Sequence, residues 1–203
     1  MSSPAEPTPE PKTTEEREGS WLLPRDLALI ALFAALIAVL GLPGSFSLFG
    51  NAVPITAQSM GVMLAGSVLG AKRGFLAVLA LEVLVAAGLP LLAGGRGGIA
   101  VFAGVTGGYL VGWLAGAAVI GWLAEKGRRT VFPLLLANVV GGIVVIYAFG
   151  VPFTAWRLGS GLLGTTVSAV TFLPGDAVKV VLTALITAGV YRSYPVPAAG
   201  RRR

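Results

Sequence analysis

Six runs of apolar residues, separated by short polar or glycine-rich connections, dominate the sequence. Each run is close to the roughly 20 residues that an α-helix needs to cross a hydrocarbon core of about 30 Å. Within the runs apolar residues are continuous rather than alternating, which favours helices over the strands of a membrane barrel. The pattern predicts an all-α integral membrane protein, a six-transmembrane-helix bundle, with runs at residues 27–43, 54–71, 74–92, 101–124, 131–150 and 174–192.

The second run is the weakest of the six. Its sequence, VPITAQSMGVMLAGSVLG, is short and mixes Thr, Gln and Ser among the apolar residues. A helix in contact with lipid has no water to satisfy such side chains. This segment could therefore be buried or broken rather than a complete span.

The two ends of the chain differ from the part between them. Residues 1–20 are rich in Pro, Glu, Ser and Thr and predict a disordered tail. They lack the basic segment followed directly by an apolar stretch that a cleavable signal peptide needs. Residues 193–203 predict a basic, solvated tail, which leaves residues 21–192 as one membrane domain.

Composition narrows the chemistry. Hydrophobic residues make up 55% of the chain and charged residues 12%, against about 25% charged residues in an ordinary soluble domain. The chain has no cysteine and no histidine, which excludes disulfides, thiolate nucleophiles, imidazole bases and the commonest zinc ligands. The sequence carries no signature of a cofactor, a metal site or a nucleotide-binding loop.

Lys and Arg are unevenly distributed among the connections. All except Arg96, Arg157 and Lys179 lie in the two terminal regions and in the connections after the second and fourth runs. Positive charge marks the cytoplasmic side of a membrane protein, so both termini are predicted to be cytoplasmic. This topology, together with anionic membrane lipid, accounts for the net charge of +6 without a nucleic-acid partner.

Three ionisable residues lie inside the runs: Glu82, Asp176 and Lys179. A charge at membrane depth costs at least about 2.5 to 3.5 kcal/mol, so it persists when it is paired, near water or functional. Asp176 follows Pro174 and Gly175 in the first turn of the last run, at its outer end, and Lys179 lies about 4.5 Å deeper along the helix axis. The two could be a structural ion pair, or they could form a polar step at an outward-facing mouth.

Two further segments are predicted to face the same mouth. The uncharged connection before the second run offers Thr56, Gln58 and Ser59, and the glycine-rich connection GLPLLAGGRGGIAVFAGVTGGY carries Arg96. A backbone this rich in glycine can approach a ligand closely. The alternatives are that Thr56 and Gln58 form hydrogen bonds between packed helices and that Arg96 is an exposed loop cation.

Four motifs, in this order, resemble the BioY family of biotin-transport S components from energy-coupling-factor (ECF) transporters. They are VPIT-Q-GVMLAG, GLP-AGG-GG, TGGY and PGD-K, and the resemblance covers about residues 25–192. It implies a multi-pass protein of a prokaryotic plasma membrane that captures biotin from outside. It also implies partners: a transmembrane coupling subunit and a pair of cytoplasmic ATPases, although some members of the family work with fewer.

The resemblance also implies which residues bind the ligand. The family's binding positions match Arg96, Asp176 and Lys179, and biotin offers ureido N–H donors, a ureido oxygen and a carboxylate to such groups. Either cation could hold the carboxylate. Where the family leads us to expect a neutral amide, this chain has Glu82, which could pair with Lys179 or Arg96 or be neutralised by burial.

Three neutral side chains are secondary candidates for the ligand site. They are Gln58, Tyr109 and Asn138, and each could equally be a packing residue. The first run carries two pairs of small residues at four-residue spacing, Ala31 with Ala35 and Ala34 with Ala38. Such pairs let another helix approach closely; the resemblance implies docking of the coupling subunit, and packing within the chain is the alternative.

Two other functions compete with biotin capture. A membrane enzyme could use Asp176 or Glu82 as a general base, but no nucleophile motif or carboxylate cluster accompanies them. A related S component could bind another vitamin, and the cations Arg96 and Lys179 then favour an anionic one. Because the sequence has no nucleotide-binding signature, any ATP hydrolysis must come from other chains.

Overall fold

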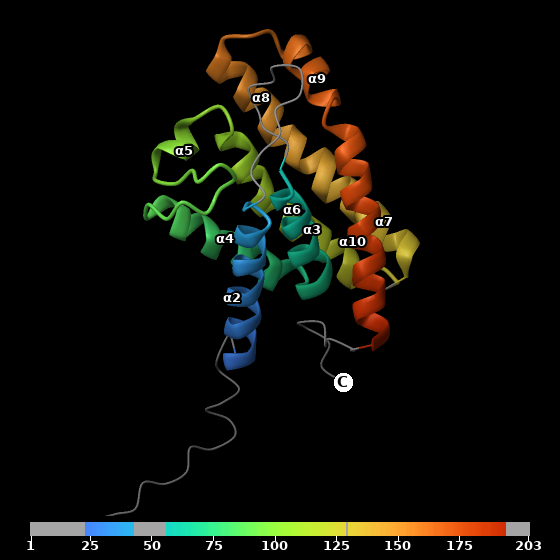
Figure 1. Cartoon of the computed structure of the whole chain (residues 1–203). Coiled ribbons are helices and arrows are strands. Elements are labelled where there is room, and N and C mark those ends of the chain that lie inside the picture. The colour runs from blue at the N-terminus through green and yellow to red at the C-terminus, as the bar shows by residue number, and fades with distance from the viewer. Residues whose placement is uncertain (1–22, 43–55, 129, 194–203) are drawn as a thin grey trace, which may run out of the picture.

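The computed structural model describes residues 23–42, 56–128 and 130–193, and most of these residues are helical (Figure 1). The prediction of an all-α chain is confirmed over these residues, which contain no β-strand. The predicted tail at residues 1–20 and residues 194–203 of the second tail lie outside them. In chain order the elements are α2 (Pro24–Val39), α3 (Gln58–Leu69), α4 (Ala71–Ala86), α5 (Ala100–Ala103), α6 (Gly107–Lys126), α7 (Val131–Val139), the π-helix η1 (Val140–Val145), α8 (Ile146–Leu158), α9 (Leu162–Val170) and α10 (Leu173–Ser193).

Among the described residues, three helical stretches are long and apolar enough to cross a membrane. They are Gly107–Lys126, the continuous stretch Val131–Leu158 and Leu173–Ser193. The second predicted run contains α3, which has 12 residues and is therefore about 18 Å long. Nearly all of α3 is buried among the other helices. The second run therefore contains a short, buried helix, as the polar residues within it indicated.

The helix ends differ from the predicted runs at several connections. The third run ends as a helix at Ala86, because Gly88 adopts a φ of +107° that side chains other than glycine rarely adopt. The fourth run is broken: α5 and α6 are separated by an extended residue, Gly104. The chain folds back there so closely that a Cβ on Gly107 would touch the carbonyl of Phe102.

The fifth helix is longer than predicted and is followed by a helix that the runs did not predict. It continues through η1 to Leu158 even though Pro152 lies inside it, and it ends where Gly159 adopts a φ of +61°. The unpredicted helix α9 connects it to α10. In Figure 1, α8 and α9 lie together at one end of the molecule, and α10 runs from there to the opposite end.

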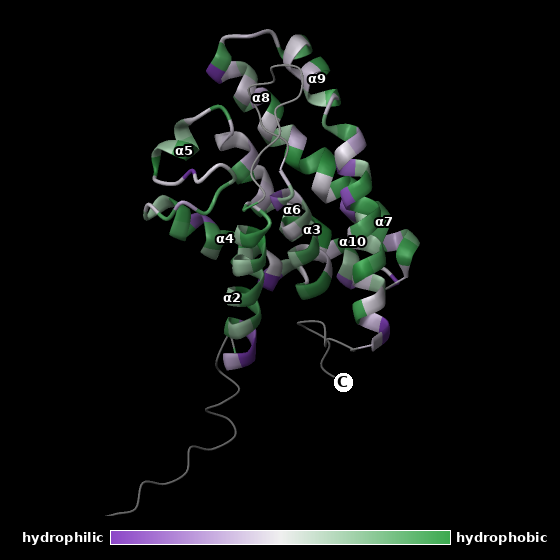
Figure 2. Cartoon of the chain, in the orientation of Figure 1, coloured by the Kyte–Doolittle hydropathy of each residue, from purple (hydrophilic) through white to green (hydrophobic). Residues whose placement is uncertain are grey.

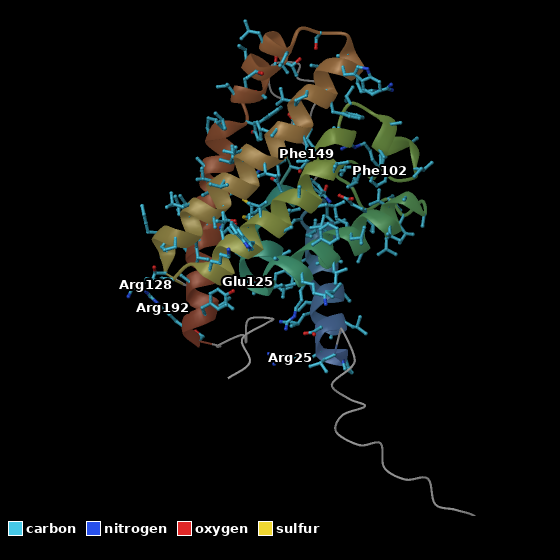
Figure 3. All side chains as sticks on the ribbon, turned by 180° about the vertical axis from the view of Figure 1, so that it is seen from behind. Arg25, Phe102, Glu125, Arg128, Phe149 and Arg192 are labelled. Carbon is cyan, nitrogen blue, oxygen red and sulfur yellow. The ribbon has the colours of Figure 1, made fainter. Side chains whose placement is uncertain are left out.

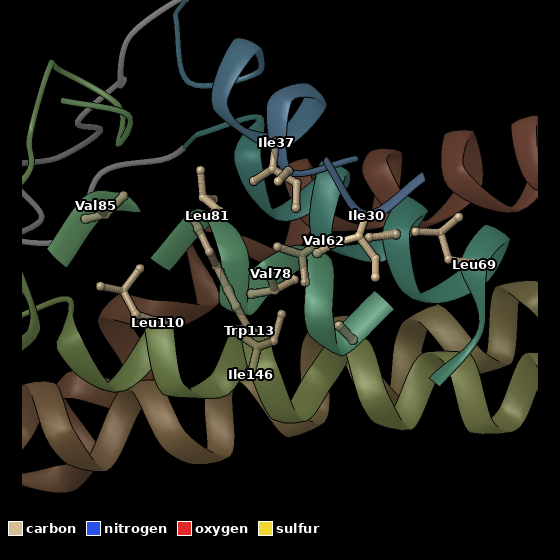
Figure 4. Close-up of a cluster of buried hydrophobic side chains, with 14 of the residues drawn as sticks. Ile30, Ile37, Val62, Leu69, Val78, Leu81, Val85, Leu110, Trp113 and Ile146 are labelled. Carbon is tan, nitrogen blue, oxygen red and sulfur yellow. The ribbon is translucent and has the colours of Figure 1, made fainter. Parts of the chain in front are cut away.

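The largest hydrophobic core joins α2, α3, α4, α6 and the start of α8. Its members include Ile37 of α2, Val62 of α3, Leu81 of α4, Trp113 of α6 and Ile146 of α8 (Figure 4). No fully buried member of this core comes from α10. The buried apolar residues of α10 are Val180, Ala184 and Ala188, which belong to two smaller clusters with residues of α3, α6 and α7.

Charged side chains gather at one end of the bundle. Figure 3 shows Arg25, Arg128 and Arg192 together at this end, which we call the basic end, with Glu125 close by. Two contacts hold the helix ends there: Arg73 Nε lies 2.9 Å from Asp26 Oδ1, and the backbone N–H of Ala71 donates to Glu125 Oε1 over 3.1 Å. The second contact caps the start of α4, where backbone N–H groups lack partners within the helix.

The remaining surface is strongly apolar. Large apolar side chains are exposed along α2, α6, α7, α9 and α10, for example Leu32, Trp122, Phe132 and Leu163. Figure 2 shows this as green on much of the helix surface, interrupted by white and purple segments. A soluble domain rarely exposes such a surface, whereas lipid contact requires it.

Candidate functional site

A cavity lies between α3, α6, η1, α8, α10 and the glycine-rich connection that precedes α5. Its wall is apolar apart from a few convergent polar groups, as in most small-molecule sites. The residues that line it are Thr56, Gln58, Ser59, Leu92, Arg96, Thr106, Tyr109, Leu110, Trp113, Gly142, Ile146, Tyr147, Phe172, Asp176 and Lys179. The structure therefore brings together Asp176, Lys179, Arg96, Gln58 and Tyr109 from the sequence prediction.

Asp176 is the centre of a hydrogen-bonded group in this cavity. It lies in the first turn of α10 and is 6% exposed. One carboxylate oxygen, Oδ1, lies 2.8 Å from Lys179 Nζ, and the other, Oδ2, accepts a hydrogen bond from the hydroxyl of Tyr147 over 2.5 Å. Lys179 Nζ also donates to Ser59 Oγ over 3.0 Å. The two alternatives for these residues are therefore not exclusive, because the ion pair is present and forms part of the cavity wall.

This group retains hydrogen-bonding capacity for a ligand. A carboxylate offers about four lone-pair sites and an ammonium group three donors. Asp176 and Lys179 each use two in the contacts described. The start of α10 adds the positive end of the helix dipole, which attracts negatively charged groups. The group can therefore accept ligand N–H donors and donate to a ligand oxygen at neighbouring points.

Arg96 provides the second polar region of the cavity. Its backbone pairs with Leu92 in a tight turn, and its side chain donates from Nε to Ala93 O over 3.2 Å and from Nη1 to Thr106 Oγ1 over 3.3 Å. Burial lowers the pKa of the Arg96 guanidinium. No described carboxylate forms an ion pair with it, so Arg96 is a cation in the cavity wall that an anionic ligand group could neutralise.

Gln58 supports the cavity through contacts with the backbone. It is 1% exposed, and its Nε2 donates to Ile37 O over 3.3 Å and to Leu91 O over 3.0 Å, while its Oε1 accepts from Ala93 N over 2.9 Å. Both amide donors are thus occupied, and the amide oxygen accepts one hydrogen bond. It joins the end of α2 to the turn that carries Arg96.

Two predicted site residues do not line the cavity. Asn138 is fully buried where α7 meets α3, with Nδ2 donating to Ser67 Oγ over 2.9 Å and to Leu134 O over 2.7 Å. Glu82 is 5% exposed on α4, and its Oε1 has no hydrogen-bond partner among the described residues. Glu82 forms no ion pair with Lys179 or Arg96. Asn138 is therefore a packing residue between helices, which was one of its two predicted roles. Glu82 lies apart from the residues that line the cavity.

Four residues that line the cavity were not predicted from the sequence: Thr106, Trp113, Tyr147 and Phe172. Tyr147 is the second residue of α8, and its ring makes an edge-to-face contact with Tyr109, with centroids 6.1 Å apart and an interplanar angle of 79°. No spacing in the sequence links Tyr147 to Asp176, 29 residues away. Thr106 could have been found as the first residue of the TGGY motif.

The two alanine pairs of α2 face in different directions. Ala31 and Ala35 are exposed, whereas Ala34 is 5% exposed and belongs to the large core. Ala38 packs against the same core. Packing within the chain therefore accounts for Ala34 and Ala38, and only Ala31 and Ala35 remain available to another protein.

Three comparisons place this architecture among known proteins. The model of the BioY family matches residues 12–196. The biotin transporter BioY of Rhizobium etli is 50% identical over 179 residues, which cover 85% of this chain and 96% of the relative. The biotin transporter BioY of Rhodobacter capsulatus is 46% identical over 192 residues, 87% of this chain and 99% of the relative. The crystal structure of an S component for biotin from an ECF-type ABC transporter superposes with a TM-score of 0.80 at 31% identity, covering 90% of this chain and 95% of that one.

Proposed function

The chain belongs to the BioY family, and on this basis we propose that it is the biotin-binding S component of a vitamin uptake transporter. It is a transport component rather than an enzyme. We further propose that it spans the cell membrane six times with both termini in the cytoplasm, which puts the basic end at the cytoplasmic face. The observation that carries the proposal is the cavity in which the Asp176 group and the unpaired Arg96 face one ligand space.

The polar groups of the cavity suit the chemistry of biotin. The ureido N–H groups would donate to the free lone pairs of Asp176, and the ureido oxygen would accept from Lys179 or Ser59 in charge-assisted or neutral bonds. Trp113 and Phe172 offer an apolar wall for the thioether ring. The ligand would replace water at every one of these groups.

Arg96 is the better candidate for the biotin carboxylate. Lys179 is already neutralised by Asp176 at 2.8 Å, whereas Arg96 has no acidic partner among the described residues. A planar guanidinium also binds a carboxylate through two parallel hydrogen bonds. A second anionic vitamin could use the same cation, so the competition of other vitamins against biotin distinguishes the two ligands.

Binding of radiolabelled biotin to the purified chain in detergent tests this proposal. We expect Asp176→Asn and Arg96→Met each to weaken binding by at least about tenfold, because a hydrogen bond to a charged group contributes about 1.5 to 3 kcal/mol. The matched control is Arg157→Met, since Arg157 is exposed in the last turn of α8. Parent-like affinity in both cavity variants, or no saturable binding by a folded parent, would reject the assignment.

We also propose that the exposed face of α2 docks a transmembrane coupling subunit, which connects the chain to a pair of cytoplasmic ATPases. Small residues allow close helix approach in membranes, and Ala31 and Ala35 are the exposed pair. Replacing both with Leu should prevent copurification with the coupling subunit and reduce uptake while leaving biotin binding unchanged. Ala34→Leu should instead destabilise the chain itself. Loss of binding in the double variant would contradict this role.

A further inference from the structure

A second hollow lies between α8 and α9, near the start of α10 and at the end of the molecule opposite the basic end (Figure 1). We call it the α8–α9 groove. Its volume is about 370 Å³, and seven of the nine residues that line it have aliphatic or proline side chains. Ala148 and Val151 of α8 and Ala169 of α9 are among them. The α8–α9 groove is therefore almost purely apolar.

The two polar side chains among the described residues that line the groove are both bonded within the chain. The Tyr147 hydroxyl donates to Asp176 Oδ2 over 2.5 Å, and Thr166 Oγ1 donates to the backbone oxygen of Leu162 over 2.8 Å. Neither hydroxyl has a hydrogen left for a ligand. A polar molecule that entered the groove would give up hydrogen bonds to water without replacing them, so the groove suits an apolar occupant.

The groove opens on the apolar surface that faces lipid. Leu162 and Val170 line it and are more than half exposed, and Leu163, beside Leu162 in the chain, is 80% exposed. Hydrocarbon rather than water therefore reaches the opening. A hollow that stays empty loses the dispersion contacts of the atoms that line it. A hydrocarbon chain from the surrounding lipid would restore these contacts by entering the groove.

The size of the groove distinguishes a lipid chain from a helix of another protein. An α-helix with its side chains is at least about 10 Å wide and rises about 5.4 Å in one turn, so a single turn takes up roughly 400 Å³. The groove has about 370 Å³ and does not admit a helix over several turns. An extended acyl chain is much narrower and adjusts its shape by rotation about single bonds, which suits a hollow between two helices.

Tyr147 lies between the α8–α9 groove and the ligand cavity, since it lines both. Its hydroxyl is bonded to Asp176, and its ring contacts the ring of Tyr109 edge to face. An occupant of the groove packs against the same ring. It thereby restricts rotation of Tyr147 away from the carboxylate of the ligand cavity.

We propose that an acyl chain of a membrane phospholipid occupies the α8–α9 groove and, by packing against Tyr147, keeps this side chain bonded to Asp176. When the groove is vacant, the ring can turn into it, and the Asp176 carboxylate loses one of the bonds that orient it. Tyr147 is thus a positioning residue for the ligand site. The lipid site itself does not depend on the ligand, whereas its effect on biotin affinity rests on the proposed function, so the two are measured separately.

Crosslinking to a phosphatidylcholine with a diazirine in one acyl chain tests the lipid site. The full-length chain is purified in a steroid-based detergent, whose rigid rings are wider than an acyl chain, and the crosslinked residues are identified by mass spectrometry. We expect crosslinks at Val151 and Ala169, which line the groove but are only 7% and 3% exposed, so that a chain on the outer surface reaches them poorly. Crosslinks confined to exposed residues such as Leu163 would overturn the proposal.

Two variants and a matched control connect the crosslinks to the groove. Thr166→Phe fills the groove from α9 and Ala148→Phe fills it from α8, and both positions are exposed, so both variants should fold. Crosslinking at Val151 and Ala169 should be lost in both. Val167→Phe places the same ring on the next residue of α9, which is 63% exposed and does not line the groove, and it should crosslink like the parent. Parental crosslinking in both filled variants would put the lipid elsewhere and reject the site.

Titration of biotin in the same detergent, with and without added phosphatidylcholine, tests the effect on the ligand site. Lipid should tighten biotin binding by the parent about three- to tenfold, because Tyr147 without lipid is bonded to Asp176 for only part of the time. Tyr147→Phe lacks the hydroxyl, so it should keep the crosslinks but bind biotin equally with and without lipid. A parent affinity that does not respond to lipid, or an equal response in Tyr147→Phe, would overturn the role of Tyr147. If the parent bound no biotin, the proposed function would fail, and the crosslinks alone would still decide the lipid site.

Discussion

The substitution Gln58→Leu separates a supporting role from direct ligand contact. Gln58 lines the cavity, yet its three hydrogen bonds all go to backbone groups: Ile37 O, Leu91 O and Ala93 N. The last four carbonyls of a helix lack partners within it. In α2 the carbonyls of Leu36, Ala38 and Val39 are bonded by the residues that follow the helix, and Gln58 supplies the partner for Ile37.

The size of the effect follows from these bonds. Leucine has a similar volume but leaves three backbone groups without partners, each at about 1 kcal/mol at the low end of the usual range, so we expect a loss of about 3 kcal/mol of stability. Two of the three bonds hold the turn from Leu91 to Arg96. Ligand binding must then order this turn at a cost of about 2 kcal/mol, which weakens biotin affinity by at most about 30-fold.

Tryptic cleavage after Arg96 reports directly on this turn. In Gln58→Leu we expect faster cleavage at Arg96, a lower melting temperature and weaker biotin binding. The three effects should appear together, because loss of the same hydrogen bonds causes them. Gln58→Glu keeps the acceptor for Ala93 N but points a buried carboxylate at two acceptors, Ile37 O and Leu91 O, so it should be at least as destabilising as the leucine variant. Lost biotin binding with parental resistance to trypsin and parental melting would refute this reasoning and make Gln58 a ligand contact.

Three further perturbations test the fold and the limits of the site. Asp26→Ala and Arg73→Met should each destabilise the chain by about 2 kcal/mol, between surface and fully buried ion pairs, with the double variant less destabilised than the sum when melting is measured. Gly108→Ala should cost about 1 to 3 kcal/mol, because its Cβ would meet the backbone and a side chain of α8, whereas Gly164→Ala should be neutral because nothing lies within 4 Å. Glu82→Gln should leave biotin affinity within about threefold of the parent and should not lower the melting temperature, since it removes an unpaired buried carboxylate; a large loss of affinity would place Glu82 in the ligand site.

Helix positions could be predicted from the sequence better than helix ends. An apolar run reflects the environment of a whole helix, so every predicted run overlaps a helix, although the fourth run is divided between α5 and α6. The ends depend on single backbone conformations, such as the positive φ of Gly88, and on how the chain folds back at Gly107. A glycine-rich connection allows many such conformations, and only tertiary contacts select among them.

Ionisable and neutral polar residues also differ in what their sequence context reveals. A charge in an apolar run needs a specific reason, which drew attention to Asp176 and Lys179 at once. Neutral residues such as Gln58, Asn138 and Thr183 have no comparable cost, and packing and ligand binding use the same amide and hydroxyl groups. Their roles depend on partners that are remote in sequence, and Asn138 and Gln58 therefore could not be distinguished before the structure placed one at an interface and the other beside a turn.

The alanine pairs of α2 show the same limit for helix faces. Ala31 with Ala35 and Ala34 with Ala38 have identical spacing, and both lie in a run that is apolar on every side. In a soluble protein the polar face would reveal which pair points outward, but in a membrane both the core and the lipid select apolar residues. The direction becomes visible only through packing: Ala34 meets the large core and Ala31 does not. Sequence alone can therefore predict that a membrane helix has a docking groove, while the face on which a partner can use it is decided by the rest of the bundle.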